Sequence, residues 1–347
     1  MKILTVSRLR TRRACARKEY LAYQRQVSPV VEEEALHVGT LVHEGLETWL
    51  REFRRGNADG ALPAALERVA GRGRDWPTQI KVDEMLRGYH LRWQDAHLEV
   101  VGAEEEFSIP LLNPETLRES RTWRLAGKID GRVRIEGQLF ILEHKTTSEY
   151  VDEPDAPYWS KLDMDHQVSA YFLGAESIAA DESEVPRGCL YDVLKKPGQV
   201  PLKATPPELR KYTKAKIDKK TGATLEPSRL YANQREWDES PEEFLLRVRE
   251  EIEANLYTYF VRRLVPRTES QLKEFLEDAW ATAREMHDTH RRGFAPRNPE
   301  ACHAYGRCIF WPLCSTGMDP EESSDYVRRA SPHPELSDAL VSRCLAS

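Results

Sequence analysis

Two short runs in the sequence bring acidic and basic side chains together with the spacing of a metal-dependent hydrolytic site. The first run carries Asp130 at the end of an apolar stretch, and the second carries Glu143 and Lys145. Because side chains alternate along a strand, Glu143 and Lys145 should share one face, with His144 on the other. Asp130 and Glu143 are therefore expected to converge on one divalent cation with an ammonium beside it. Hard oxygen ligands of this kind suit Mg²⁺ or Mn²⁺ and the hydrolysis of a phosphodiester.

Two helices are expected to flank these strands. Upstream, apolar residues at helical spacing predict an amphipathic helix over residues 38–54, with His43 one turn before Glu47. Downstream, an apolar helix is predicted over residues 165–178, where Gln167 and Tyr171 are four apart and share a face. A single histidine or a Gln-Xaa3-Tyr pair is common on ordinary helices, so the order of the elements carries the argument.

That order is a helix His, a strand Asp, a strand Glu-Xaa-Lys and a helix Gln-Xaa3-Tyr. It resembles the RecB-like branch of the PD-(D/E)XK nuclease superfamily, over residues 7–314. The resemblance implies an α/β, restriction-endonuclease-like core in which a central mixed sheet is flanked by helices. It also implies DNA as the partner and Mg²⁺ or Mn²⁺ as the cofactor.

The resemblance carries roles onto particular residues. It implies that His43, Asp130 and Glu143 bind the metal, that Lys145 assists the attacking water, and that Gln167 and Tyr171 place the DNA strand. The proline that often precedes the first aspartate is absent, since Ile129 stands there, as in many RecB-like members. Glu105 or Glu106, before an apolar run, offers a further carboxylate.

Six cysteines are present, and three of them form the run Cys302-Xaa5-Cys308-Xaa5-Cys314. The chain has no secretory signal, so closely spaced thiols favour metal binding over disulfides. Three ligands are one short of a filled tetrahedral site, and Cys15 in the basic N-terminal helix is the best fourth. His303 replacing one cysteine, or three unrelated thiols, remain alternatives. Cys189 is expected in a strand core and Cys344 in a tail where it binds nothing.

One early and three late cysteines around a nuclease core resemble the iron–sulfur nucleases of the same branch, including the AddB nuclease domain and CRISPR-associated RecB-like exonucleases. The resemblance implies a structural [4Fe–4S] cluster that staples the chain ends, held by Cys15, Cys302, Cys308 and Cys314, with zinc as the alternative. The first gap of the late trio departs from the family pattern, which has two residues there.

Composition agrees with a soluble DNA-binding protein. Charged residues make up 31% of the 347 residues and hydrophobic ones 40%, and no apolar run could span a bilayer, which argues against a membrane partner and for the cytoplasm. The formal charge is −6, but lysines and arginines cluster in residues 8–18 and 195–220. Local clusters, not the net charge, bind phosphates.

The expected organisation is an N-terminal helical region with Cys15 and His43 (residues 1–100), a nuclease core (101–195), a basic insertion (196–240), a strand, helix and cysteine region (241–316) and a loosely held polar tail (317–347). A loop is expected after the helix over 38–54, separate strands near 122–129 and 132–135, helices near 241–254 and 269–292, and a strand over 257–265. The prolines and lysines of the insertion predict a flexible or hairpin-like segment. The resemblance implies an exonuclease that prefers single-stranded DNA ends. Alternatives are a non-catalytic DNA-binding subunit with a zinc or iron–sulfur knot in a repair or CRISPR adaptation complex, and a redox protein. No Gly-Xaa4-Gly-Lys-Ser/Thr motif occurs, so any unwinding needs a helicase partner.

Overall fold

The computed structural model describes residues 1–30, 34–96, 98–153, 155–181, 184–218, 220–221, 223–226, 228–304 and 306–346. Its centre is a six-stranded mixed sheet in the order β1-β4-β5-β6-β9, with β3 also paired to β4. These strands are β1 (Lys2–Leu4), β3 (Glu99–Leu112), β4 (Glu119–Ile135), β5 (Gln138–Thr147), β6 (Cys189–Lys195) and β9 (Phe260–Val265).

The long strand β4 creates a fork in the sheet. β3 runs antiparallel along one edge of β4. On the other edge, β1 pairs in parallel with residues 123–125, and β5 pairs antiparallel with residues 131–135. The stretch of β4 between those two partners is left without a ladder on that edge, and Asp130 lies at its end. The sheet thereby opens a gap at the residue that the sequence singled out.

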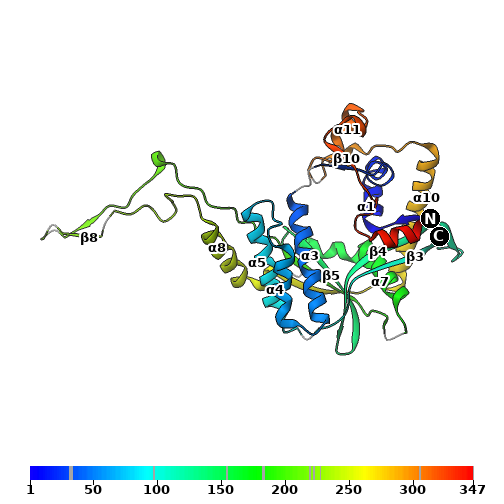
Figure 1. The fold of residues 1–347 in the computed structure, drawn as a ribbon, viewed down its shortest axis with the longest axis horizontal. Coiled ribbons are helices and arrows are strands. Elements are labelled where there is room, and N and C mark those ends of the chain that lie inside the picture. The colour runs from blue at the N-terminus through cyan, green and yellow to red at the C-terminus, as the bar shows by residue number, and fades with distance from the viewer. Residues whose placement is uncertain are drawn as a thin grey trace.

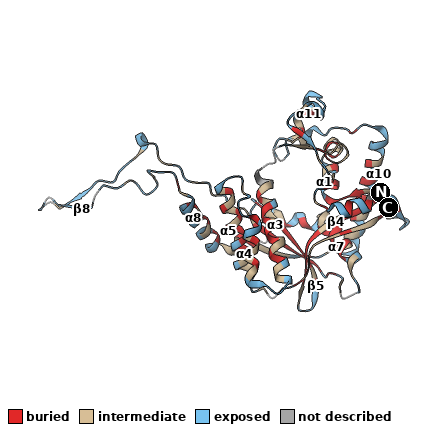
Figure 2. Ribbon diagram, in the orientation of Figure 1, coloured by how far each residue is buried: buried red, intermediate tan, exposed pale blue. Residues whose placement is uncertain are grey.

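Helices cover both faces of the sheet (Figure 1). One face carries α3 (Glu34–Arg54), α4 (Ala58–Val69), α5 (Trp76–Trp93) and α8 (Pro241–Ala254), and the other carries α7 (His166–Ile178) and α10 (Glu269–Arg292). Each layer buries its own apolar cluster against the sheet, as the red inner surfaces in Figure 2 show. The expected α/β architecture, with a mixed sheet between helices, is confirmed.

Capping explains why several helices start where the sequence predicted. Ser240 and Thr268 each form a capping box at the first turns of α8 and α10, and α10 ends at Gly293 in the left-handed conformation. Asp165 caps α7 by accepting hydrogen bonds from the backbone of the first turn. These local signals do not depend on the tertiary structure.

Other elements differ from the sequence-based expectation. A loop was expected after α3, but α4 forms there, because Ala61, Ala65 and Val69 recur at helical spacing and are buried beneath α3. Two strands were expected within β4, which is one continuous strand. The strand predicted from Tyr257 begins later, since α9 (Leu256–Tyr259) precedes β9.

The C-terminal segment is not a loose tail. β10 (Tyr326–Arg328) pairs with β2 (Val27–Pro29), and α12 (Asp338–Ala346) packs Leu340 and Val341 on Ile3 of β1. Cys344 is buried in this contact, and its Sγ lies 3.1 Å from Ser108 Oγ. The two ends of the chain therefore lie together (Figure 1), and residues 1–100 are not wholly helical.

The remaining short elements build the surface around the cysteines and the loop after β5. They are α1 (Val6–Ala14), α2 (Ala16–Glu19), the π-helical turn η1 (Tyr20–Gln24), α6 (Pro157–Ser160), η2 (Lys161–Met164), η4 (Pro207–Leu209), η5 (Pro299–Cys302), α11 (Trp311–Thr316) and η6 (Pro320–Glu322). No helix in the described residues is long and apolar enough to cross a bilayer.

Residues 196–240, here called the arm, leave the body between β6 and α8 and project far from it (Figure 1). A short hairpin of β7 (Lys216–Ile217) and β8 (Thr224–Glu226) lies near its far end. The hairpin-like insertion expected from the prolines and lysines is thus present as a two-legged projection.

Candidate active site

Asp130 is held in the fork of the sheet. Its Oδ2 accepts a hydrogen bond of 2.9 Å from the backbone N–H of His144, which bridges the gap between β4 and β5. Asp130 is 9% exposed, and its neighbours set its charge. Burial would raise the pKa of Asp130, but the hydrogen bond from His144 and the nearby cationic groups outweigh burial and lower it. Asp130 is therefore a carboxylate at neutral pH.

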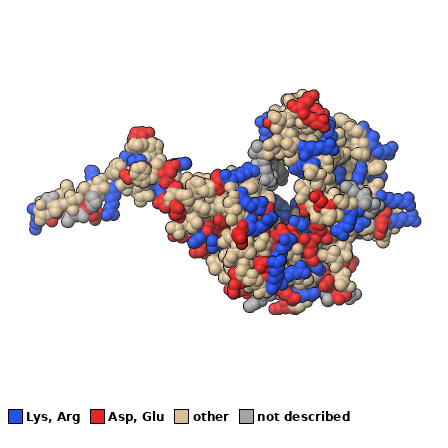
Figure 3. All heavy atoms as spheres, in the orientation of Figure 1, with Lys and Arg blue, Asp and Glu red and all other residues tan. Residues whose placement is uncertain are grey.

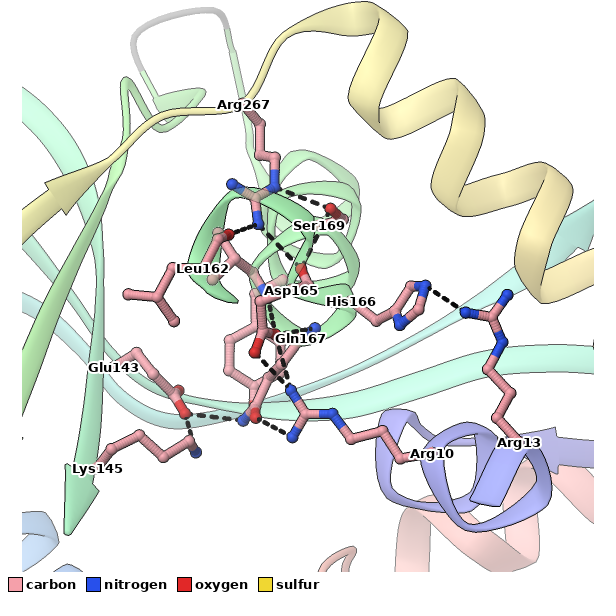
Figure 4. Close-up of polar contacts among 12 residues, drawn as sticks. Arg10, Arg13, Glu143, Lys145, Leu162, Asp165, His166, Gln167, Ser169 and Arg267 are labelled. Carbon is pink, nitrogen blue, oxygen red and sulfur yellow. Dashed lines mark hydrogen bonds and ion pairs between the residues drawn. The ribbon is translucent and has the colours of Figure 1, made fainter. Parts of the chain in front are cut away.

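Glu143 and Lys145 point to the same side of β5, as alternation requires, and contact each other (Figure 4). Gln167 of α7 donates a hydrogen bond of 2.8 Å to Glu143 Oε1 and another of 2.8 Å to the hydroxyl of Tyr171. The four side chains therefore form one group at the end of β5. Glu143 Oε2 is buried and makes no hydrogen bond within the described residues.

The charges of this group depend on one another. Burial raises the pKa of Glu143 to about 8, and the negative charge of Asp130 adds to the rise. Burial alone would lower the pKa of Lys145, but the carboxylates of Glu143 and Asp130 outweigh it and raise that pKa. The two carboxyl groups are thus close enough to repel each other, which is the setting in which a divalent cation is favoured.

His43 reaches the same place from α3. Its Nδ1 lies 3.6 Å from Asp130 Oδ2. Although 32% of its side chain is exposed, the surrounding atoms desolvate the ring, and burial lowers the pKa of His43 to about 4. A neutral imidazole has a free lone pair, which is the form that a metal ion binds.

Glu105 and Glu106 are engaged in other contacts, and Glu104 is the glutamate of β3 that interacts electrostatically with Asp130. Glu105 pairs with Arg132 through hydrogen bonds of 2.6 and 2.9 Å, and Glu106 accepts hydrogen bonds of 2.5 Å from Ser337. Burial raises the pKa of Glu104 to about 7, and the charge of Asp130 adds to the rise, so Glu104 lies beside the site.

The shift of position has a backbone cause. A register irregularity between residues 100 and 102 of β3 precedes Glu104, which adopts φ 55°. A positive φ departs from regular strand geometry, so the direction of the Glu104 side chain does not follow from alternation in the sequence. Lys128 of β4 forms an ion pair with Glu104 and so partly neutralises the negative charge of Glu104.

Three arginine contacts fix the start of α7, which carries Gln167 (Figure 4). Arg10 of α1 donates to both carboxylate oxygens of Asp165 at 2.8 and 2.7 Å and approaches Gln167 Oε1 at 3.4 Å. Arg267 donates to the Asp165 carbonyl at 2.9 Å and to Ser169 Oγ at 2.9 Å. Arg13 contacts His166 at 3.1 Å on the same turn. The sequence marked Arg10 and Arg13 only as members of a basic cluster, and Arg267 was not singled out.

A buried polar network lies behind the site. Tyr89 donates to Asp192 Oδ2 at 2.8 Å, and its oxygen lies 2.9 Å from His144 Nε2. Because the hydroxyl has a single proton, which goes to Asp192, His144 Nε2 must be the donor in its contact. Arg262 closes the network on Asp192 at 2.5 and 2.6 Å. In the sequence, the acidic Asp192 within the apolar run of β6 was the available sign of this buried network, and it was not used.

The carboxylates suit a divalent cation by their chemistry. Two repelling acidic groups, a neutral histidine and the unpartnered Oε2 of Glu143 are all features that a bound cation would satisfy. Among the described residues, however, no three His, Cys, Asp or Glu side chains are drawn together tightly enough to make a finished metal cage.

The four predicted cysteine ligands lie in one neighbourhood. Cys15 stands at the break between α1 and α2, and its Sγ accepts a hydrogen bond of 3.4 Å from the backbone of Asn298. Burial raises the pKa of Cys314, and Cys15, Cys308 and Cys302 all add to the rise, so the thiols are close together. Among the described residues, however, the sulfur atoms are not arranged closely enough to form a finished metal site.

The other two cysteines lie apart from this group. Cys189 is buried in β6, as predicted, and Cys344 is buried in α12.

The fold and the site agree with a comparison against protein families. Residues 3–315 match the model of the PD-(D/E)XK nuclease superfamily. A comparison with curated proteins found no match. The matched region contains all of the sheet except the first residue of β1, both helical layers and the carboxylates of the fork. With a match over nearly its full length and a restriction-endonuclease-like sheet, this chain belongs to the PD-(D/E)XK nuclease superfamily.

Proposed function

We propose that this protein is a Mg²⁺- or Mn²⁺-dependent deoxyribonuclease whose cation binds between Asp130, Glu143 and His43. The observation that carries the proposal is the environment of Glu143, which lies on β5 beside the fork. One of its oxygens is held by Gln167 and Lys145, and the other is buried without a partner beside a second carboxylate. A bound cation would polarise the phosphate and lower the pKa of a water molecule.

The chain's own residues would prepare the reaction. Lys145, whose pKa is raised by the carboxylates, stays protonated and is placed to steady the developing negative charge or to orient the water. Gln167 fixes the orientation of Glu143, and Tyr171 holds Gln167 in place. Glu104 is the candidate for a further cation ligand.

We also propose that the protein is of the RecB-like branch and carries a [4Fe–4S] cluster on Cys15, Cys302, Cys308 and Cys314, with zinc as the alternative. The shared neighbourhood of the four thiols supports this proposal. The cluster would join the N-terminal helices to the C-terminal segment, which is a structural role. An absorbance spectrum of anaerobically purified protein, with iron and zinc counts, tests it. A protein with neither metal would contradict it.

The preferred substrate in this proposal is a single-stranded DNA end. Figure 3 shows an opening between α3, which carries His43, and the N-terminal helices, which carry Arg10 and Arg13. An opening of that kind suits a strand threaded from its end better than an intact duplex. A helicase or a recombination or CRISPR protein would supply such ends.

Cleavage of end-labelled single-stranded and duplex DNA with Mg²⁺, Mn²⁺ or Ca²⁺ tests the proposal. We expect metal-dependent cleavage by the wild type, and its loss in Asp130→Asn and in Lys145→Ala without loss of DNA binding. Retained cleavage in both variants would contradict the assignment. Binding without cleavage by the wild type would instead favour a non-catalytic DNA-binding subunit.

A further inference from the structure

The arm is an ordered element that adds nothing to the core. Its legs are joined by backbone hydrogen bonds from Thr205 to Arg235 (2.8 Å), Thr213 to Arg229 (2.8 Å) and Tyr231 to Lys211 (3.0 Å). None of the described residues between 198 and 238 is buried. Beyond its base, which contacts α8, the arm is shaped by its own contacts, and a long segment of this kind that is not a disordered linker is usually functional.

Charge is divided along the arm. At its base the acidic residues are already engaged: Glu239 is buried and accepts two hydrogen bonds of 2.7 Å from Arg247 of α8, and Asp238 pairs with Lys203 at 3.0 Å. The tip, defined as residues 210–231, holds seven lysines and arginines against two acidic residues, in a chain whose formal charge is −6. The base therefore anchors the arm, and the tip presents positive charge.

The cations of the tip are available to a ligand. Lys211, Lys214, Lys220 and Arg229 form no ion pair with any described residue, and Lys216 has only the exposed partner Glu226, at 3.0 Å. The blue side chains along the arm in Figure 3 show this surface standing clear of the body. When such side chains bind a chain of phosphates, the counterions condensed on the phosphates are released, and this release favours binding.

Aromatic rings accompany these cations. Tyr212 is 49% exposed and Tyr231 is 43% exposed, and the bridge between residues 212 and 230 places them on adjoining positions of the two legs. Exposed aromatic side chains among lysines are the combination on which nucleic-acid bases stack. An acidic peptide would use the charges but would have no need of the rings.

We propose that the tip of the arm binds DNA at a second location, remote from the carboxylates of the fork. The inference rests on the proposed function, because it assigns this DNA to the same substrate molecule. A leg of about 20 extended residues reaches roughly 60 Å at about 3.3 Å per residue. Only DNA much longer than the strand held in the active site can therefore touch both places, so the arm adds affinity for long DNA without changing the chemical step.

The test compares a tip variant with a matched control. The tip variant replaces Lys211, Lys214, Lys220 and Arg229 by alanine, and the control replaces the exposed residues Arg54, Arg55, Arg118 and Lys273, all outside the arm, so that both lose the same charge. Binding of 60-nucleotide and 12-nucleotide DNA is measured in EDTA over a range of salt concentrations, and melting temperatures check the fold.

For the tip variant we expect at least about tenfold weaker binding of the long DNA. The slope of log affinity against log salt should also become smaller by up to about 3, since each lost phosphate contact reduces that slope by about 0.7 to 0.9. Binding and cleavage of the 12-nucleotide DNA should match the wild type. Equal binding of long DNA by the wild type and the tip variant would overturn the proposal, as would an equal loss in the control or with the short DNA. Failure of the nuclease assignment is separate, because it would appear as absence of cleavage in the wild type.

Discussion

Replacing Glu143 by glutamine should stabilise the metal-free protein while it destroys the catalytic site. Glu143 has no exposed surface, and one of its oxygens has no partner in the described residues. Burial raises its pKa from 4.5 to about 8 in the folded protein. Glutamine has nearly the same shape, still accepts the hydrogen bond from Gln167 and carries no charge to bury.

The sign of the pH dependence follows from proton binding. Between pH 4.5 and about 8 the folded protein keeps a proton on Glu143 that the unfolded chain has lost. The contribution of Glu143 to the free energy of unfolding therefore falls as the pH rises through this window, by about 1.4 kcal/mol per pH unit, and levels off above it. At pH 7, which is 2.5 pH units above the ordinary pKa of 4.5, the cost is at most about 3.5 kcal/mol, and at pH 5 it is below about 1 kcal/mol.

Urea unfolding in EDTA at pH 5, 6, 7 and 8 measures this effect. We expect the free energy of unfolding of Glu143→Gln to exceed that of the wild type by an amount that grows with pH. Glu149→Gln is the matched control. Glu149 is exposed, lies just after the end of β5, and has Lys161 as its only ion-pair partner among the described residues. A gap that does not change with pH, or a variant less stable than the wild type at pH 8, would refute the reasoning.

The remaining predictions concern the surroundings of the site. Asp192→Ala should lower the free energy of unfolding by about 3–5 kcal/mol, because it leaves the buried guanidinium of Arg262 without its counterion. The double replacement Asp192→Leu with Arg262→Met should recover most of that loss, as measured by urea unfolding. Arg10→Met should slow cleavage at saturating DNA by about tenfold or more, since it frees the start of α7, yet leave the melting temperature nearly unchanged; unaltered cleavage rates would contradict this role. Cys308→Ser should lower the melting temperature more than Asp130→Ala does, and equal melting temperatures would count against a structural cluster.

The sequence analysis was most successful where the signal is local. The bounds of α8 and α10 were predicted because capping residues and apolar spacing act within a single helix. Alternation along one strand likewise placed Glu143 and Lys145 together and His144 on the opposite face. These features need no knowledge of what packs against them.

Predictions failed where a distant segment completes the structure. The segment that contains α12 appears polar in isolation, but Ile3 of β1 and Ala126 of β4 supply the apolar surface on which its few hydrophobic residues pack. Glu104, and not its neighbours, interacts with Asp130, and its positive φ departs from regular strand geometry. Neither outcome has a signature within a window of a few residues.

Sequence alone thus determined the types of the reactive groups and their order on helix and strand, because periodicity and capping are properties of adjacent residues. The tertiary structure decided which of them meet. The pairing of β1 with β4 that forms one side of the fork, the arginine of α1 that holds the start of α7, and the ion pair of Asp192 with Arg262 each join residues at least 70 positions apart. Such contacts arise only when the sheet has formed and two helical layers have closed over it, because no window of adjacent residues contains both partners.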